Sequence, residues 1–201
     1  MKRVIHGNLL IRAAICGFIL AILFSFTGFS AQCDLLERSV LRLHIPANSD
    51  SEKDQAVKLQ VRDAVLNEAA LWYGDAKDFD EALALVCTHI NSLEEAANRV
   101  LQNENMPYRA TAEICDAYFP TRVYETGALP AGKYRTVRIS LGKADGKNWW
   151  CVLFPSICVS GASEIDAIPK GARDIVEQDG KITVKFKAAE ILTFLRERFD
   201  V

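Results

Sequence analysis

The alternation of apolar and polar positions predicts that residues 40–45 form a strand with one buried face. Leucine and isoleucine side chains fill every second position, while Arg42 and His44 occupy the positions between them. Pro46 ends the strand, because proline cannot donate to a backbone hydrogen-bond ladder. The chain is therefore expected to bend sharply after residue 46.

A helix is predicted to follow this bend, starting near Glu52. Residues 48–51 are all helix-capping types, and Ser51 and Asp54 have the spacing of a capping box, although aspartate replaces the usual glutamate. Apolar side chains then recur every three or four residues. The charged side chains between them, including Lys58, are expected mostly to face water.

A second helix is predicted after the turn at residues 73–75. Asp78 and Glu81 repeat the capping pattern, and apolar side chains then recur at alternating steps of four and three up to Val100. Two helices joined by a short polar connection should pack antiparallel and cover a sheet or each other.

Beyond residue 107 the pattern becomes typical of strands. Strands are predicted at residues 108–119, 134–141 and 149–154. The Asp145-Gly146 pair between the last two strands predicts a hairpin. The last strand is apolar on both faces, which favours a central place in the sheet. A loop at residues 126–133 is expected to project from the sheet.

The C-terminal part is predicted to contain a polar linker at residues 160–180, a short strand at residues 182–186 and a docked helix at residues 188–199. The complete order of elements predicts an α+β fold, with a mixed or antiparallel β-sheet packed against two or three helices. We expect a signalling domain over residues 32–159 and a C-terminal unit over residues 160–201.

The first 31 residues have the features of an export signal. Lys2, Arg3 and Arg12 precede an almost uninterrupted apolar run over residues 13–29, and small residues follow it. The run is close to the roughly 20 residues that span a bilayer, so a cleaved signal peptide and a retained membrane anchor both fit. Positive charge before the run predicts that the rest of the chain lies outside the cytoplasm.

The exported part is mildly acidic. The N-terminal segment holds three of the 24 basic residues and none of the 26 acidic ones, which leaves 21 against 26 and a net charge of −5. Nucleic-acid binding requires a clustered basic face, and the sequence contains no such cluster. The sequence therefore argues against nucleic acid as a partner.

Five cysteines follow the N-terminal segment. Cys151 and Cys158 are the closest pair, and an oxidising exterior permits a disulfide between them, although the odd number leaves at least one thiol unpaired. Neither His44 nor His89 has a neighbouring ligand at metal-site spacing. We expect buried thiols or one structural disulfide, with no metal and no cofactor.

Two interpretations of the bend are chemically possible. The first is a hydrolase constellation drawn from His44, Ser49, Asp50 and Asp54. It requires a hydrogen bond between Ser49 and His44. The second is a helix cap, which accounts for every polar side chain over residues 48–54, and the Gly-x-Ser-x-Gly elbow of hydrolases is absent. The cap is the favoured interpretation.

Two separated blocks of the sequence carry a family resemblance. The block RLHIPANSDSEKDQAVKLQVRDAVL, residues 42–66, joins an Arg-x-His strand to Ala-Asn-Ser-Asp-Ser, and residues 134–158 contain Gly-Lys-Asn-Trp-Trp-Cys-Val. Both blocks resemble the stage II sporulation protein R family. The resemblance covers most of the exported body and extends to residues 185–187.

The resemblance implies a non-enzymatic signalling protein of endospore-forming bacteria. Such a protein is exported from the forespore into the intermembrane space, either secreted or held by an N-terminal membrane segment. There it would activate a membrane-bound aspartic protease, which cleaves the precursor of a mother-cell sigma factor. The alternatives are an exported hydrolase acting on cell-wall or peptide substrates and a membrane-tethered structural protein.

The bend and the exposed face of the first helix are the surface that we expect this protease to contact. The candidate partner-binding residues are His44, Asn48, Asp50, Asp54, Gln55, Lys58, Arg62 and Asp63. Each of them can equally belong to a cap or to an ordinary solvated helix face.

Overall fold

A mixed four-stranded sheet with two long helices on one face forms the main body of the molecule. The computed structural model describes residues 12–13, 15–18, 20, 31–74, 76–124, 127–155, 168–170 and 172. Its labelled elements are β1 (Leu41–Pro46), α2 (Glu52–Ala70), α3 (Phe79–Asn103), β2 (Ala110–Phe119), β3 (Arg122–Tyr124), β4 (Gly127–Leu129), β5 (Gly132–Leu141) and β6 (Asn148–Phe154). A short helical segment at residues 31–37 precedes β1.

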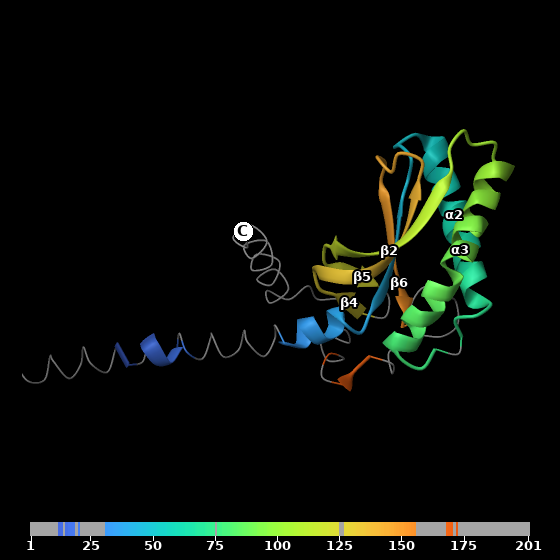
Figure 1. Cartoon of the computed structure of the whole chain (residues 1–201). Helices are drawn as coiled ribbons and strands as arrows, with labels where there is room; N and C mark the ends of the chain where they lie inside the picture. The colour runs from blue at the N-terminus through green and yellow to red at the C-terminus, as the bar shows by residue number, and fades with distance from the viewer. Residues whose placement is uncertain are drawn as a thin grey trace, which may run out of the picture.

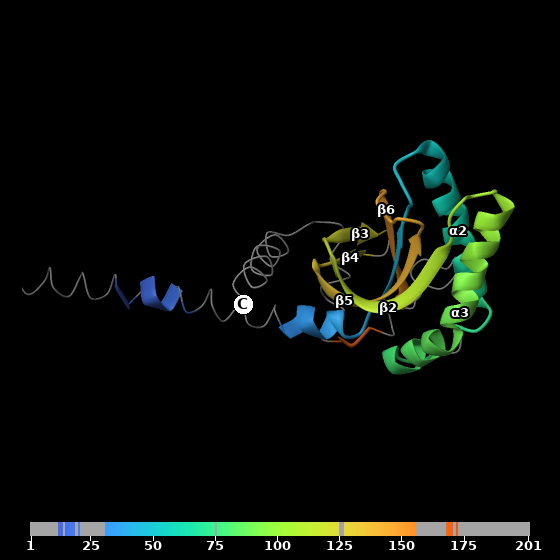
Figure 2. The same ribbon diagram turned by 45° about the horizontal axis from the view of Figure 1, so that its top comes forward.

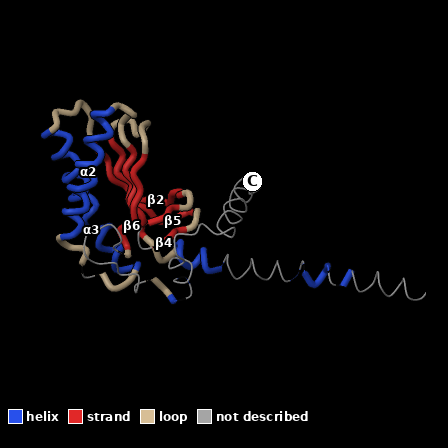
Figure 3. Tube along the Cα trace, turned by 180° about the vertical axis from the view of Figure 1, so that it is seen from behind, coloured by secondary structure: helices blue, strands red, loops and turns tan. Residues whose placement is uncertain are grey.

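The strands of the sheet follow the order β2-β5-β1-β6. Strand β1 runs parallel to β5 and antiparallel to β6, and β2 pairs antiparallel with β5. Helices α2 and α3 lie side by side against one face of this sheet (Figures 1 and 3). The predicted α+β class, with a mixed sheet packed against helices, is confirmed.

The main core lies between the helices and the sheet. Leu43 and Ile45 of β1 are fully buried there, together with Val61 of α2 and Val86 and Leu93 of α3. These are the apolar positions that the strand and helix periodicities select, because a period of two or of 3.6 places them on one face of each element.

A second apolar cluster covers part of the opposite face of the sheet. It includes Leu36 from the segment at residues 31–37, Phe119 from the end of β2 and Leu129 from β4. Strands β2 and β5 curve around the small β3–β4 hairpin (Figure 2). Both faces of the sheet therefore carry buried side chains.

The predicted hairpin between β5 and β6 is wrong. Strand β1 lies between them, and residues 142–147, which we name the crossover loop, step across its end. In this loop Gly146 donates a backbone hydrogen bond to Ala47 O at 2.9 Å. A Cβ atom on Gly146 would lie only 2.3 Å from Ser49 O. This glycine therefore permits close approach of two backbones, where the sequence pattern suggested a tight turn.

Two further predictions about the β-rich part are corrected. Strand β6 is an edge strand of the described sheet, and its two apolar faces reflect the two clusters that cover it. The segment at residues 126–133 contains β4 and the start of β5, and Leu129 and Ala131 within it are buried. A segment that was expected to project therefore packs against the sheet.

Several predictions fall on residues outside the described ranges. They are the linker at residues 160–180, apart from residues 168–170 and 172, the strand at 182–186, the helix at 188–199 and nearly all of the N-terminal segment. Among the described residues, no helix combines the length and apolar character needed to cross a bilayer.

Candidate functional site

The strand-to-helix corner, residues 46–54, is closed by a helix cap at Ser51. The Ser51 backbone is extended, with φ −61° and ψ 147°, and its Oγ accepts a hydrogen bond from Asp54 N at 3.2 Å. The predicted cap is therefore confirmed. In a complete capping box, the side chain three residues later accepts a hydrogen bond from the backbone N–H of the cap residue. Here Ser51 N donates instead to Ser49 Oγ at 3.2 Å.

Asp54 is the centre of the corner. Its side chain is buried and accepts hydrogen bonds from Asn48 Nδ2 at 2.9 Å and from Ser49 Oγ at 2.5 Å, while the Tyr108 hydroxyl donates to its other carboxylate oxygen. Burial raises the pKa of Asp54, but the hydrogen bonds outweigh this effect and bring the pKa below its ordinary value. Asp54 is thus an ionised acceptor that ties three segments together.

The crossover loop fastens the corner from the other side. Its Lys143 N donates to Asn48 Oδ1 at 3.0 Å, and Lys147 N donates to Asp50 Oδ1 at 2.7 Å. Each side chain satisfies a backbone group that would otherwise need water. The corner therefore has a fixed shape, set by residues that lie almost one hundred positions apart in the chain.

Lys58 lies beneath this surface and does not face water as predicted. The residue is 6% exposed, and its Nζ donates to Gln55 Oε1 at 2.7 Å and to Lys147 O at 3.1 Å. Burial lowers the pKa of Lys58 below its ordinary value, and the Asp50 carboxylate offsets part of this effect. Lys58 thus links α2 to the crossover loop.

The eight predicted partner-binding residues fall into three groups by exposure. Asp50 and Asp63 are exposed, and Asp54 and Lys58 are buried. The half-exposed ones are His44, Asn48, Gln55 and Arg62. Because Asp54 and Lys58 point inward, they can shape a contact surface but cannot themselves be part of it.

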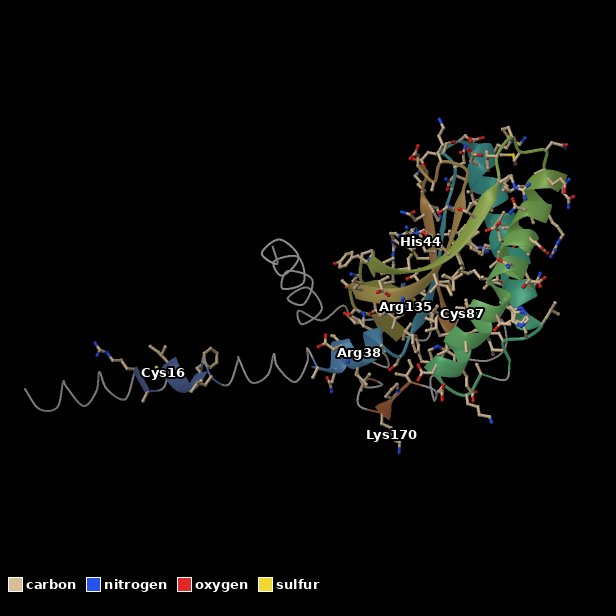
Figure 4. All side chains as sticks on the ribbon, in the orientation of Figure 1. Cys16, Arg38, His44, Cys87, Arg135 and Lys170 are labelled. Carbon is tan, nitrogen blue, oxygen red and sulfur yellow. The ribbon has the colours of Figure 1, made fainter. Side chains whose placement is uncertain are left out.

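The hydrogen bond that a hydrolase constellation requires is not formed. His44 Nε2 is hydrogen-bonded to Asn148 Oδ1 at 2.8 Å, and its Nδ1 is buried without a partner. Ser49 Oγ instead donates to Asp54. Burial lowers the pKa of His44, with the Asn148 hydrogen bond opposing this and Arg138 adding to it. His44 faces away from the two helices (Figure 4). Its ring lies 6.1 Å from the Phe119 ring and 6.0 Å from the Trp150 ring, beside the second apolar cluster and not beside Ser49.

Arg42 occupies an environment that the sequence did not indicate. Predicted to lie on the polar face of a half-buried strand, it is fully buried, and its guanidinium lies 4.1 Å from the ring centre of Phe119 and 5.0 Å from that of Tyr134. It donates to Tyr124 Oη at 2.7 Å and to Cys151 O at 3.1 Å, while Nη1 has no partner. Aromatic rings surround this cation in place of a carboxylate.

The cysteines are divided between one disulfide and several free thiols. Cys151 is disulfide-bonded. Its predicted partner Cys158 lies outside the described residues, so the pairing stays a prediction. The free cysteines among the described residues are Cys16, Cys33, Cys87 and Cys115. Burial raises the pKa of the Cys33 thiol to about 12, which keeps it protonated. No group of three potential metal ligands converges within the described ranges.

Comparison with known proteins identifies the relatives of this chain. The profile of the family described as stage II sporulation protein R matches residues 37–164. Stage II sporulation protein R of Bacillus subtilis (strain 168) is 34% identical over 152 residues, which cover 76% of this chain and 65% of that protein. The chain thus matches slightly less than two thirds of the length of this relative. No solved structure matches it significantly.

The fold and the corner define an α+β domain with a rigid polar surface and without an assembled Ser–His pair. Its matched region includes the corner, all eight labelled elements and the crossover loop. The chain belongs to the stage II sporulation protein R family. This membership supports a role in sporulation.

Proposed function

We propose that this chain is an exported, non-enzymatic signalling protein of sporulation that activates a membrane-bound aspartic protease. The activated protease would then cleave the precursor of a mother-cell sigma factor. Membership in the stage II sporulation protein R family is the observation that carries this proposal. The export signal expected over residues 1–31 agrees with it, because the signal must reach the space between forespore and mother cell.

The geometry of the corner supports a binding role for this surface. Hydrogen bonds from three separate segments engage Asn48, Asp50 and Asp54, so the surface exists before any partner arrives. A preorganised surface loses little conformational entropy on binding, which favours recognition. The exposed and half-exposed members of the predicted set then provide the contacts, with Asp54 and Lys58 holding them in place.

The proposal is tested by producing the full chain together with the protease and the sigma-factor precursor in a host that lacks other sporulation proteins. Cleavage of the precursor, followed by immunoblot, should depend on the chain and on its N-terminal export segment. Precursor cleavage that proceeds equally without the chain would contradict the proposal.

The contact surface is tested in the same assay with a double charge reversal, Arg62→Glu with Asp63→Lys. Both side chains belong to α2 and pair with each other at 2.7 Å, and the Arg62 guanidinium also lies 5.4 Å from the Trp149 ring centre, so the change in stability should be small. We expect precursor cleavage to fall at least tenfold. Arg99→Glu on α3 is the matched control, because Arg99 is 60% exposed and pairs at the far end of α2 with Glu68. An equal effect of both variants would exclude the corner as the specific surface.

The same assay separates signalling from catalysis. A hydrolase that relies on His44 would lose all activity in His44→Ala, and would also cleave its substrate in the absence of the protease. We expect precursor cleavage to require the protease in every case. Cleavage by the chain and precursor alone would establish an enzyme.

A further inference from the structure

A row of four cross-strand neighbours lies on the sheet face that points away from the helices. Glu113 of β2 is paired with Arg138 of β5, Arg138 with His44 of β1, and His44 with Trp150 of β6. Arg122 of β3 lies over the Trp150 ring, 4.1 Å from its centre. We name these five residues the open row, because all of them are exposed or half-exposed.

The hydrogen-bonding capacity of the open row is largely unused. Arg138 contacts Glu113 at 3.3 Å through Nη1, and its Nε is buried without a partner, so a ligand can reach this guanidinium only at its terminal nitrogens. A charge-assisted hydrogen bond is normally about 2.7–2.9 Å long, and guanidinium and carboxylate groups often form two such bonds in parallel. His44 Nδ1 beside it is also unpartnered but is buried, so it is not a contact for a ligand. Arg138 is thus held by a weak contact that a better placed carboxylate can replace.

Arg122 forms no ion pair with any carboxylate of the described residues. Its guanidinium lies over the Trp150 ring and also interacts electrostatically with Arg42 and Tyr124. Arg62 gives a direct comparison on the helix side of the sheet. It lies 5.4 Å from the ring centre of Trp149 but is paired with Asp63 at 2.7 Å. Stacking fixes the plane of a guanidinium and leaves its N–H groups free, so Arg122 is oriented for a ligand.

The local charge of the open row also favours an acidic ligand. Two guanidinium groups of the row face one carboxylate, and the fully buried Arg42 below them has an unpartnered Nη1 and no carboxylate of its own among the described residues. This local excess of positive charge stands on a body with a net charge of −5, from 21 basic and 26 acidic residues. Isolated positive surface on an acidic protein favours an acidic partner and excludes basic ones.

We propose that the open row binds an acidic segment of a partner protein, with one carboxylate on Arg138 and a second on Arg122. Neighbouring strands are about 4.8 Å apart, so β5 and β6 are separated by about 10 Å. An extended chain covers this distance in about three residues. The segment therefore carries acidic side chains roughly three residues apart, and because residues three apart on a regular strand point to opposite faces, its chain turns between the two contacts, as a glycine-containing segment can. The Trp150 and His44 rings lie between these contacts. The inference rests on the proposed function in one respect only, the identity of the partner protein that carries the acidic segment.

The test uses two synthetic peptides and the full chain in detergent. The first peptide is four repeats of Glu-Gly-Ser with blocked ends, and the second replaces every glutamate by glutamine. Binding is measured by NMR from the indole N–H signal of Trp150, assigned with Trp150→Phe. We expect the glutamate peptide to shift this signal, and to bind at least tenfold more tightly than the glutamine peptide. Its affinity should fall as salt is added.

Variants locate the binding site. Arg122→Gln combined with Arg138→Gln should weaken binding of the glutamate peptide at least tenfold, whereas Arg99→Gln, at an exposed arginine of α3, should leave its affinity unchanged. Arg122→Lys keeps the charge but not the planar guanidinium that lies on the ring, so the affinity for the glutamate peptide should fall about three- to fivefold. Thermal unfolding of each variant verifies the fold. Equal binding of both peptides, no shift of the Trp150 signal, or equal losses in the open-row and Arg99 variants would overturn the inference.

The peptide assay contains no protease, so its outcome is independent of the proposed function. If the glutamate peptide binds but precursor cleavage does not depend on the chain, the open row stands and the signalling role fails. If cleavage depends on the chain but the peptide does not bind, the signalling role stands and the open row fails.

Discussion

In the corner, the Asp54 carboxylate takes hydrogen bonds from Asn48, Ser49 and Tyr108, whereas in the open row Arg138 contacts its carboxylate at 3.3 Å through a single nitrogen. Both regions sit on the same small sheet and contain ionised side chains. In the corner, the charged side chains of Asp50, Asp54 and Lys58 all form hydrogen bonds within the protein. In the open row, the exposed Arg122 guanidinium lies over a ring and forms no ion pair with a described carboxylate.

This difference separates two uses of polar side chains. A buried carboxylate with three donors stabilises a shape, because removing it leaves those donors unsatisfied. A guanidinium that lies on a ring without a carboxylate partner contributes little to stability and is available to a ligand. Substitutions in the corner should therefore change the free energy of unfolding, and those in the open row should change binding.

The largest effect is expected from Asp54→Ala. It leaves three hydrogen-bond donors in or near the buried corner without an acceptor, so the free energy of unfolding should fall by about 3 kcal/mol. Denaturation with urea, followed by circular dichroism, measures the change. Asp63→Ala, on the exposed face of the same helix, should change the value by less than about 0.5 kcal/mol. Similar losses in the two variants would mean that the corner is not held by Asp54.

The next effect is expected from Gly146→Ala in the crossover loop. The new Cβ would lie 2.3 Å from the Ser49 carbonyl oxygen, so the loop must move away from the corner. Overpacking of this kind costs about 2 kcal/mol, and the same urea titration detects it. Gly74→Ala is the control, since a Cβ there meets no atom within 4 Å. A neutral Gly146→Ala would argue that the loop does not press on the corner.

Much of the fold follows from local sequence patterns. The alternation in β1 places Leu43 and Ile45 on the helix side, and the steps of three and four in α3 place Val86 and Leu93 in the same core. The cap at Ser51 depends on residues only three positions apart. Each of these features depends on neighbours in the chain, so a single sequence is enough to predict it.

The features that sequence reasoning missed depend on distant contacts. The Asp-Gly pair suggested a hairpin, but β1 lies between the two strands, and local turn chemistry carries no information about an inserted strand. Arg42 is surrounded by rings from β2, β3 and β5 that lie about 80 to 90 positions away in the chain, so no local pattern around residue 42 reveals them. The alternation with the leucines of β1 predicted the correct face of the strand for Arg42, but it did not predict that the side chain is buried.

Lys58 provides a smaller test of the same comparison. Lys58→Met removes two hydrogen bonds that link α2 to the crossover loop, but it also removes the cost of burying an ammonium group. The net loss in the free energy of unfolding should be about 1 kcal/mol. Arg62→Met, one turn further along α2, should change it by less than about 0.5 kcal/mol, because Arg62 is only half-buried and its pair with Asp63 is at the surface. A neutral Lys58→Met would mean that the amine reaches water.

The smallest change in stability, and the sharpest test of the open row, is expected from Glu113→Gln. The Glu113 carboxylate is 57% exposed and contacts Arg138 at 3.3 Å, so its loss should leave the free energy of unfolding within about 0.5 kcal/mol of the original value. The same carboxylate competes with any acidic ligand for Arg138. Its removal should therefore tighten binding of the glutamate peptide about two- to fivefold, measured from the Trp150 indole signal. Asp116→Asn removes the carboxylate that pairs with Arg135, outside the row and with its side chain 45% exposed, and should not affect affinity. A glutamate peptide that binds more weakly to Glu113→Gln would show that Glu113 orients Arg138 for the ligand, and that the ligand does not replace it.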